Sequence, residues 1–275
     1  MLRLAVFLFL GLAVSAQAQS RRPSHCIAIA DAAPGLSYVQ LAKFDAPVPD
    51  YSVRLTYIDH SMVLLQTPGG LDVITDYSGG LTGPDFVPDV VTMNRAHQSH
   101  WTMFPDERIP YVLKGWGESV AGADHNLDLG EMLIRNVPTD IRGRFGGAPQ
   151  INGNSIFVFE VEGLCIGHLG HLQQEPTDAQ YAALGRLDVV MAAVDGSMTL
   201  PTDIIVRILK RLKSSVVIPM HWFGRYSLDR FVLEMSDEFA VERPGGSDYV
   251  VSLNTLPRQP TIVVLEPVYA PFGDE

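Results

Sequence analysis

Four histidines at or just past the ends of apolar stretches are the residues of this chain best suited to chemistry. His97 and His100 follow the apolar run Val90–Met93, whereas His171 and His221 follow two later runs, in LCIGHLGH and VVIPMH. Histidines three apart on one turn can direct both imidazoles toward one point. A histidine pair alone is more often structural, but the two later histidines favour a metal site, because strand ends position sites and imidazole binds zinc.

The order of these motifs resembles that of a known superfamily. VVTMNRAHQSHW, then a strand ending in GHLGH and a strand ending in PMH, is similar to the metallo-β-lactamase fold superfamily. Within it, the chain resembles the metal-dependent hydrolases similar to the ascorbate-phosphate lactonases. The resemblance extends from about residue 53 to about residue 264. It implies an α/β fold, a four-layer αβ/βα sandwich of two mixed sheets with helices outside.

The superfamily carries a T-H-x-H-x-D-H loop, which this chain matches only in part. His97 and His100 fall on the second and third histidines of that loop. Arg95 stands where the first histidine belongs, and Ser99 stands where the aspartate belongs. Arginine stays protonated and cannot bind a metal ion. The loop therefore keeps two ligands and loses two.

The later motifs of the superfamily are also altered. His221 matches the late histidine, and His171 takes the place of the aspartate that bridges two metal ions. The isolated middle histidine is expected near residues 139–142, where the sequence TDIR contains none. The departures leave the fold expectation intact and argue against a two-metal site.

The remaining histidines predict one zinc-type ion. The predicted ligands are His97, His100, His171 and His221. Three of them would leave a coordination position where water can ionise near neutral pH, whereas all four would close a tetrahedral shell. We therefore predict a mononuclear metal-dependent hydrolase that uses a metal-activated water on an ester, lactone or phosphodiester. Ser99 could position the water, and Arg95 could steady developing negative charge or bind an anionic group of the substrate.

Asp76 and His60 are further candidates. Asp76 ends the expected strand 71–75. The resemblance implies that an aspartate here orients the histidine loop, and such carboxylates fix the tautomer and direction of a ligand ring. Asp76 could instead pair with Arg95 or cap a glycine-rich turn. His60, in YIDHS, lies beside a turn; the resemblance implies support of the site from below, and we predict a structural role.

A second function of a different class fits the same residues. A metallo-β-lactamase scaffold that has lost ligands can serve as a non-catalytic binding protein, because a fold does not determine function. Arg95 would then fill the lost metal site. Both alternatives predict a small-molecule partner, with Arg95 favouring an anionic one.

Composition and the N-terminal segment limit the possible partners and the cellular location. The chain has 275 residues, 47% of them hydrophobic, and a formal charge of −11, which argues against nucleic-acid and anionic-membrane partners. Residues 1–18 are typical of a signal peptide, with Arg3 before an apolar stretch too short to span a bilayer and an A-x-A site at its end. A lead-in, 19–52, and one domain, 53–275, follow. We expect an exported protein, periplasmic or secreted, without stable membrane insertion; the oligomeric state is not indicated.

The two cysteines could form a disulfide in an exported protein. Cys165 lies inside an apolar stretch, however, so we predict a small core residue there in preference to a bridge to Cys26.

Apolar runs and periodicity predict the following strands and helices. Strands are expected at 53–58, 62–66, 71–75, 90–93, 132–136, 156–161, 164–166, 189–194, 216–219, 249–253 and 261–265, the last two in the second sheet, and helices at 176–185, 201–213 and 228–235.

Overall fold

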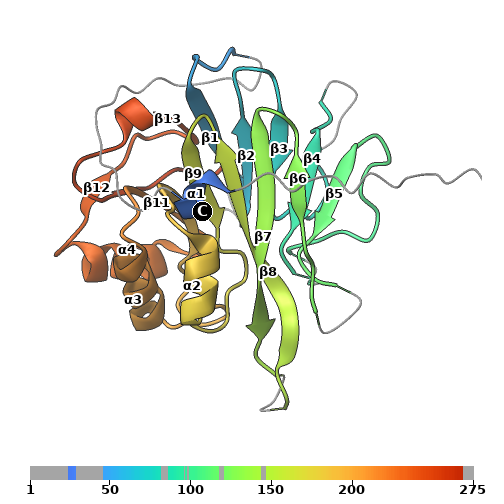
Figure 1. Ribbon diagram of the computed structural model, residues 1–275. Helices are drawn as coiled ribbons and strands as arrows, with labels where there is room; N and C mark the ends of the chain where they lie inside the picture. Colours follow the sequence, from blue (N-terminus) through green and yellow to red (C-terminus); the bar gives the residue numbers. More distant parts are fainter. Residues whose placement is uncertain are drawn as a thin grey trace, which may run out of the picture.

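Two mixed β-sheets packed face to face form the framework of the molecule (Figure 1). The computed structural model describes residues 24–28, 46–81, 86–95, 97, 99–117, 121–143 and 147–268. The predicted signal peptide, 1–18, lies outside the described residues, as do 19–23 and 29–45 of the predicted lead-in. None of the helices within the described ranges has both the length and the apolar character needed to cross a membrane.

The first sheet has six strands in the order β13-β1-β2-β3-β4-β5. They are β1 (Ser52–Asp59), β2 (Met62–Gln66), β3 (Asp72–Ile74), β4 (Val90–Met93), β5 (Tyr111–Lys114) and β13 (Asp248–Ser252). Strands β3, β4 and β5 are parallel, whereas β1 is antiparallel to β2 and β13. Because β3 and β4 are parallel, Asp76 after β3 and the histidine loop after β4 emerge at the same edge.

The second sheet has eight strands in the order β12-β14-β11-β10-β9-β8-β7-β6. They are β6 (Asn126–Asp128), β7 (Met132–Ile141), β8 (Gln150–Val161), β9 (Leu164–His168), β10 (Val189–Ala193), β11 (Val216–Met220), β12 (Ala240–Glu242) and β14 (Thr261–Val263). Strands β9, β10 and β11 are parallel neighbours. Their carboxyl ends therefore deliver His171, Asp195 and His221 to one edge of this sheet.

Alternation along the strands builds the core between the sheets. Val53, Leu55 and Tyr57 of β1 point inward, as do Phe157 and Phe159 of β8, and all five are buried. Successive side chains of a strand point to opposite faces, so the intervening residues of β8 face the helices instead. The regular alternation explains why the sequence predicts most of these strands closely.

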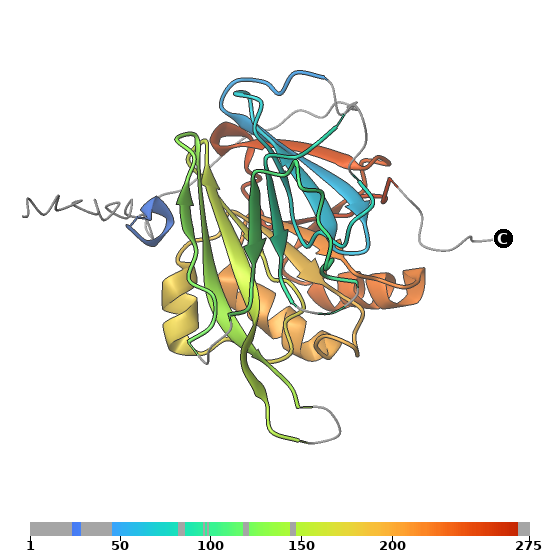
Figure 2. The same cartoon turned by 90° about the vertical axis from the view of Figure 1, so that its right-hand side faces the viewer.

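The main helices of the described residues cover the outer face of the second sheet (Figure 2). They are α2 (Asp178–Leu184), α3 (Thr202–Leu212) and α4 (Arg225–Met235). The outer face of the first sheet is covered instead by loop residues, among them Phe86, Trp101 and Trp116. The two mixed sheets agree with the predicted fold, but within the described residues helices flank only one of them.

The N-terminal residues of the described chain are joined to β9 by a disulfide. Cys26, in α1 (His25–Ala28), pairs with Cys165 of β9, with their Cα atoms 5.7 Å apart. The sequence-based preference for an unpaired core cysteine was therefore wrong. The physical reason is that Cys165 points to the helix-covered face of its sheet, where α1 packs beside α2.

Two further parts of the fold differ from the sequence prediction. Residues 249–253 were expected in the second sheet, but β13 pairs antiparallel with β1 of the first sheet, with Val251 opposite Val53. Strands β5, β6 and β12 were not predicted. Each is three or four residues long, too short for a clear periodic pattern.

Candidate metal centre

Loops from both sheets bring histidines together at one edge of the sandwich. His100 follows β4 of the first sheet, and His60 occupies the turn between β1 and β2. His171 and His221 follow β9 and β11 of the second sheet. Parallel strands carry their carboxyl ends to a common edge, so packing the two sheets places residues far apart in sequence side by side.

Three of these imidazoles form a compact group. The ring centroids of His60 and His221 are 4.1 Å apart, and each ring centroid lies 5.2 Å from that of His100. One nitrogen from each ring lies within 4.8 Å of the corresponding nitrogen of the other two. Three nitrogens so close together could bind a single metal ion.

Asp76 determines which nitrogen of His100 faces this group. The buried Asp76 carboxylate contacts Nδ1 of His100 and also accepts a hydrogen bond of 3.2 Å from the backbone N–H of Asn94. A carboxylate accepts hydrogen bonds, so the ring proton lies on Nδ1 and the lone pair on Nε2. That Nε2 is buried and has no hydrogen-bond partner among the residues that the structure describes. Asp76 thus contacts the histidine loop.

Asp195 makes the equivalent contact to His221. Its Oδ2 lies 3.1 Å from Nδ1 of His221. The same carboxylate accepts hydrogen bonds from the backbone N–H groups of Ser197, Met198 and Thr199 and from the Thr199 hydroxyl. Burial opposes ionisation of Asp195, but these donors and His221 outweigh it and hold its pKa below the usual range. A fixed, ionised carboxylate therefore orients His221.

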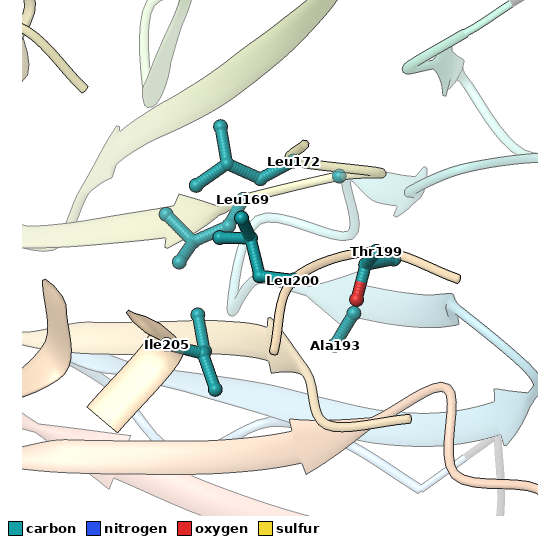
Figure 3. A pocket seen from close by; sticks show the side chains of 7 residues that line it. Leu169, Leu172, Ala193, Thr199, Leu200 and Ile205 are labelled. Atoms are coloured by element: carbon teal, nitrogen blue, oxygen red, sulfur yellow. The ribbon is translucent and has the colours of Figure 1, made fainter. Parts of the chain in front are cut away.

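The loop that carries Asp195 is anchored by an apolar contact. Leu200 lines a small pocket together with Leu169, Leu172 and Ile205 (Figure 3). The pocket lies between the residues after β9 and the start of α3. Leu200 and the carboxylate of Asp195 thus hold the two ends of one short loop.

His60 is tied to His221 through the backbone. The carbonyl of His60 accepts hydrogen bonds from the His221 N–H, at 2.7 Å, and from the Tyr57 hydroxyl, at 2.8 Å. His60 and His221 both have positive φ angles, 48° and 57°, which are uncommon for residues other than glycine. Within the described part of the chain, the buried Nε2 of His60 has no hydrogen-bond partner.

Burial keeps the imidazoles of His60 and His100 neutral. Desolvation, followed by repulsion from neighbouring histidines, lowers the pKa of His60 to about 3 and that of His100 to about 2. Neutral imidazole is the form that binds metal ions. Two buried nitrogens without a partner are costly unless something satisfies them, so the residues present fit a bound cation.

Arg95 and His171 meet beside this group. Nη1 of Arg95 lies 3.0 Å from Nδ1 of His171, and Nε2 of Gln173 lies 3.3 Å from the same atom. The His171 ring is edge-on to His100, with centroids 4.6 Å apart, and edge-on to His221 at 5.5 Å. Arg95 thus contacts His171 in the region where the family motif has its first ligand.

The other predicted site residues lie further out. His97 is exposed, with its ring centroid 5.9 Å from His100 and 6.0 Å from His171. Its Nδ1 lies 3.3 Å from the Ser99 hydroxyl. His97 and Ser99 therefore border the group of three imidazoles.

Two buried residues near the site make structural hydrogen bonds. His168, the last residue of β9, is buried, and both of its nitrogens are used, Nδ1 by Asn94 and Nε2 by the carbonyl of Ser61. In the region expected to supply a middle histidine, Thr139 instead accepts a hydrogen bond of 2.7 Å from Asn154. His168 thus links β9 to two loops, and Thr139 links β7 to the neighbouring β8.

Phe223 borders the same group from the solvent side. Its side chain is 56% exposed, and its ring centroid lies 5.0 Å from that of His221 and 5.5 Å from that of His60. An exposed aromatic ring against two buried histidines is available to an apolar part of a ligand.

Sequence reasoning missed two residues of this arrangement. His60 was predicted to be structural because a single histidine beside a turn has no spacing signal. Asp195 was noticed only as a strand end, and the available signal was its position directly after the buried run that precedes α3. Neither residue lies near His100 or His221 in the sequence, so only the packing of the two sheets reveals that they meet.

The site and fold agree with a known family. The family described as "Beta-lactamase superfamily domain" matches residues 54–221, which is more than half of the chain. This chain belongs to the beta-lactamase superfamily. The matched region of this superfamily member begins in β1 and ends at His221, so it contains all three grouped imidazoles. None of the curated proteins matches the chain.

Solved structures of the superfamily share the fold. A protein from Thermotoga maritima, classed with the Zn-dependent hydrolases of the metallo-beta-lactamase superfamily, is 25% identical with a TM-score of 0.56, over 78% of this chain and 99% of its own. YhfI from Bacillus subtilis, a metallo-beta-lactamase fold protein, is 10% identical with a TM-score of 0.51, over 78% and 97%. The likeness to YhfI shows the fold alone.

Proposed function

We propose that the protein is an exported metal-dependent hydrolase with one zinc-type ion held by His60, His100 and His221. The observation that carries this proposal is a pair of buried Nε2 atoms, on His60 and His100, for which the described residues supply no hydrogen-bond partner. The third member of their group is His221. Zn²⁺ in such a site supplies Lewis-acid chemistry for hydrolysis near neutral pH.

The protein side chains have separate tasks in this proposal. Asp76 and Asp195 hold the Nδ1 protons of His100 and His221, which leaves the Nε2 lone pairs available. A backbone hydrogen bond from His221 to His60 joins the two turns that carry these rings. Ser99 and His97 border the group on its exposed side, where a substrate and its attacking water would enter.

This ligand set overlaps with the sequence prediction in His100 and His221. His60 replaces the other two predicted ligands, because His97 is exposed and His171 gives its Nδ1 to Arg95. Three protein ligands leave a coordination position open, which a catalytic zinc site needs.

The proposed substrate is a small ester, lactone or phosphodiester. The sequence resemblance to the lactonase-like hydrolases supports a lactone or phosphorylated substrate, and the Thermotoga maritima neighbour is classed as a Zn-dependent hydrolase. Arg95 supports an anionic group on the substrate, because its guanidinium lies beside the imidazole group. Phe223 offers an apolar contact on the same side.

The proposed export rests on the cysteine pair together with the leader-like residues 1–18. Disulfides form in oxidising compartments and are rare in the cytosol. Fractionation of cells that express the full chain should recover the protein outside the cytoplasm, with Cys26 and Cys165 resistant to alkylation until a reductant is added. Recovery in the cytoplasm with two free thiols would refute export.

Elemental analysis tests the proposed metal site. The full chain, purified without chelator or histidine tag, should hold roughly one zinc ion per molecule. His60→Ala and His221→Ala should each lose most of it. His125→Ala is a matched control, because His125 lies in a different loop and contacts the carbonyl of Lys114. Zinc retained equally in His60→Ala and His125→Ala would exclude His60 as a ligand.

The Arg95 contact with His171 favours a second candidate, a non-catalytic binding protein with Arg95 in the lost metal site. Hydrolysis of bis(4-nitrophenyl) phosphate, 4-nitrophenyl acetate and γ-butyrolactone distinguishes the two. A hydrolase should turn over at least one of them in a zinc-dependent manner. If the natural protein holds no zinc and the Arg95→His variant does, that result would support the binding protein instead.

A further inference from the structure

We infer that Arg95 holds His171 as a hydrogen-bond donor to an oxygen atom of the substrate, outside the set of metal ligands. This inference rests on the proposed function for the substrate, but its first step concerns only the protein. Sequence analysis placed His171 among the ligands. The contacts of its ring lead to a different role.

The first step is the direction of the hydrogen bond between the two side chains. Arginine carries only N–H donors and does not lose its proton in proteins. The His171 Nδ1 atom, 3.0 Å from Nη1 of Arg95, must therefore accept. Gln173 places a second N–H donor 3.3 Å from the same nitrogen. The ring proton of neutral His171 consequently lies on Nε2.

The contrast with the grouped histidines supports this assignment. Nδ1 of His100 and Nδ1 of His221 face carboxylates, which accept, so their Nε2 atoms carry lone pairs. Nδ1 of His171 faces a cation, so its Nε2 carries a hydrogen. Rings with opposite tautomers thus lie side by side, and neither nitrogen of His171 offers a free lone pair to a metal ion.

The backbone around His171 keeps the ring in this position. The His171 N–H donates a hydrogen bond of 3.1 Å to Oδ1 of Asn154. Gly170, directly before it, has a φ of 62°, and a Cβ there would overlap Asn94. A side chain other than hydrogen at Gly170 would be strained and crowded, so the turn that presents His171 is closely constrained.

The N–H of His171 is then available to a ligand. Its Nε2 has no hydrogen-bond partner among the described residues, and the ring lies edge-on to both His100 and His221. A fixed, neutral donor beside a hydrolytic site can stabilise negative charge that develops on a carbonyl or phosphoryl oxygen. Arg95 is the positioning residue, since it acts through His171 and sets the tautomer.

Nitrogen-15 NMR of histidine-labelled, metal-free protein tests the tautomer directly. The His171 signals, assigned by their loss in His171→Gln, should show protonated Nε2 and an unprotonated, hydrogen-bonded Nδ1. Arg95→Met, which removes the donor but keeps the length of the side chain, should shift His171 toward a mixture of tautomers. Predominant protonation at Nδ1 in the natural protein would overturn the inference. This result does not depend on whether the protein binds zinc.

Zinc titration and an oxyanion probe test the role. His171→Gln and His171→Leu should keep the zinc affinity of the natural protein within about threefold, unlike His221→Ala. Inorganic phosphate should bind the zinc-loaded natural protein and His171→Gln, which retains an N–H donor, about fivefold or more tightly than His171→Leu. Loss of zinc in both His171 variants, or phosphate binding that is absent or unaffected by His171→Leu, would overturn the assignment.

Discussion

Oδ2 of Asp195 lies 3.1 Å from Nδ1 of His221, although 26 residues separate the two in the chain. The contact exists because β10 and β11 are parallel neighbours, so the residues that follow them emerge together. Carboxylates that hold the second nitrogen of a metal-binding histidine fix its direction and raise its basicity. Asp195 and Asp76 supply two such contacts to one group of imidazoles.

Replacing Asp195 should weaken metal binding without abolishing it. In Asp195→Asn the site loses the negative charge beside His221, so we expect zinc affinity to fall about 10- to 100-fold. Competition with a chromogenic chelator measures this change. Asp203→Asn, in the exposed first turn of α3, is the control and should bind zinc normally. Unchanged zinc affinity in Asp195→Asn would show that this carboxylate does not support metal binding.

Reduction of the disulfide should lower stability and leave the metal site intact. Cys26 and Cys165 are 139 residues apart, so the bridge restricts a long loop in the unfolded chain. We expect the double variant Cys26→Ser/Cys165→Ser to lose about 2–4 kcal/mol in urea unfolding. Its zinc content should match that of the natural protein, because α1 packs on the helix-covered face. Parallel loss of zinc would show that the two regions are coupled.

The stabilising effect of Glu160 should depend on pH. Burial opposes ionisation of Glu160, but hydrogen bonds from Arg135 and Ser24 outweigh it and lower its pKa. A lowered pKa means that the stabilisation is fully present above the ordinary carboxyl value and is lost as the pH falls through the lowered one. Glu160→Gln leaves the Arg135 charge without its buried partner, so it should cost about 3 kcal/mol near neutral pH.

Urea unfolding over a range of pH measures this effect. The difference in unfolding free energy between the natural protein and Glu160→Gln should be constant near neutral pH and shrink in acid, below the ordinary carboxyl pKa. Glu162→Gln, on the adjacent turn between β8 and β9, provides a control. A difference that grows as the pH falls would contradict the lowered pKa of Glu160.

Phe223 should affect substrates that carry apolar groups. Its exposed ring contacts His221 and His60, so Phe223→Ala removes an apolar surface beside the imidazole group. We expect unchanged zinc content and a KM raised about fivefold for an aryl ester, with a smaller effect on a short aliphatic ester. Tyr226→Ala, three residues further along the chain and 82% exposed, is the control. An equal change in KM for both esters would show that Phe223 does not contact the apolar part of the substrate.

The sequence alone determined most of the strands, the main helices and the superfamily, but not the short strands β5, β6 and β12. Buried strands such as β4 and β11 are short apolar runs, and α3 has polar and apolar faces, so their local patterns specify them. The position of His100 and His221 at strand ends followed from the same patterns. These properties depend on neighbours in the chain, which a sequence displays directly.

Tertiary structure decided which side chains meet. His60 joins His221 through a backbone hydrogen bond across more than half of the chain, and Asp195 reaches His221 because two parallel strands are adjacent. Cys26 reaches Cys165 by packing on the outer face of the second sheet. Such contacts depend on sheet order and on which face a residue occupies, and residues that are distant in the chain show no spacing that reveals either.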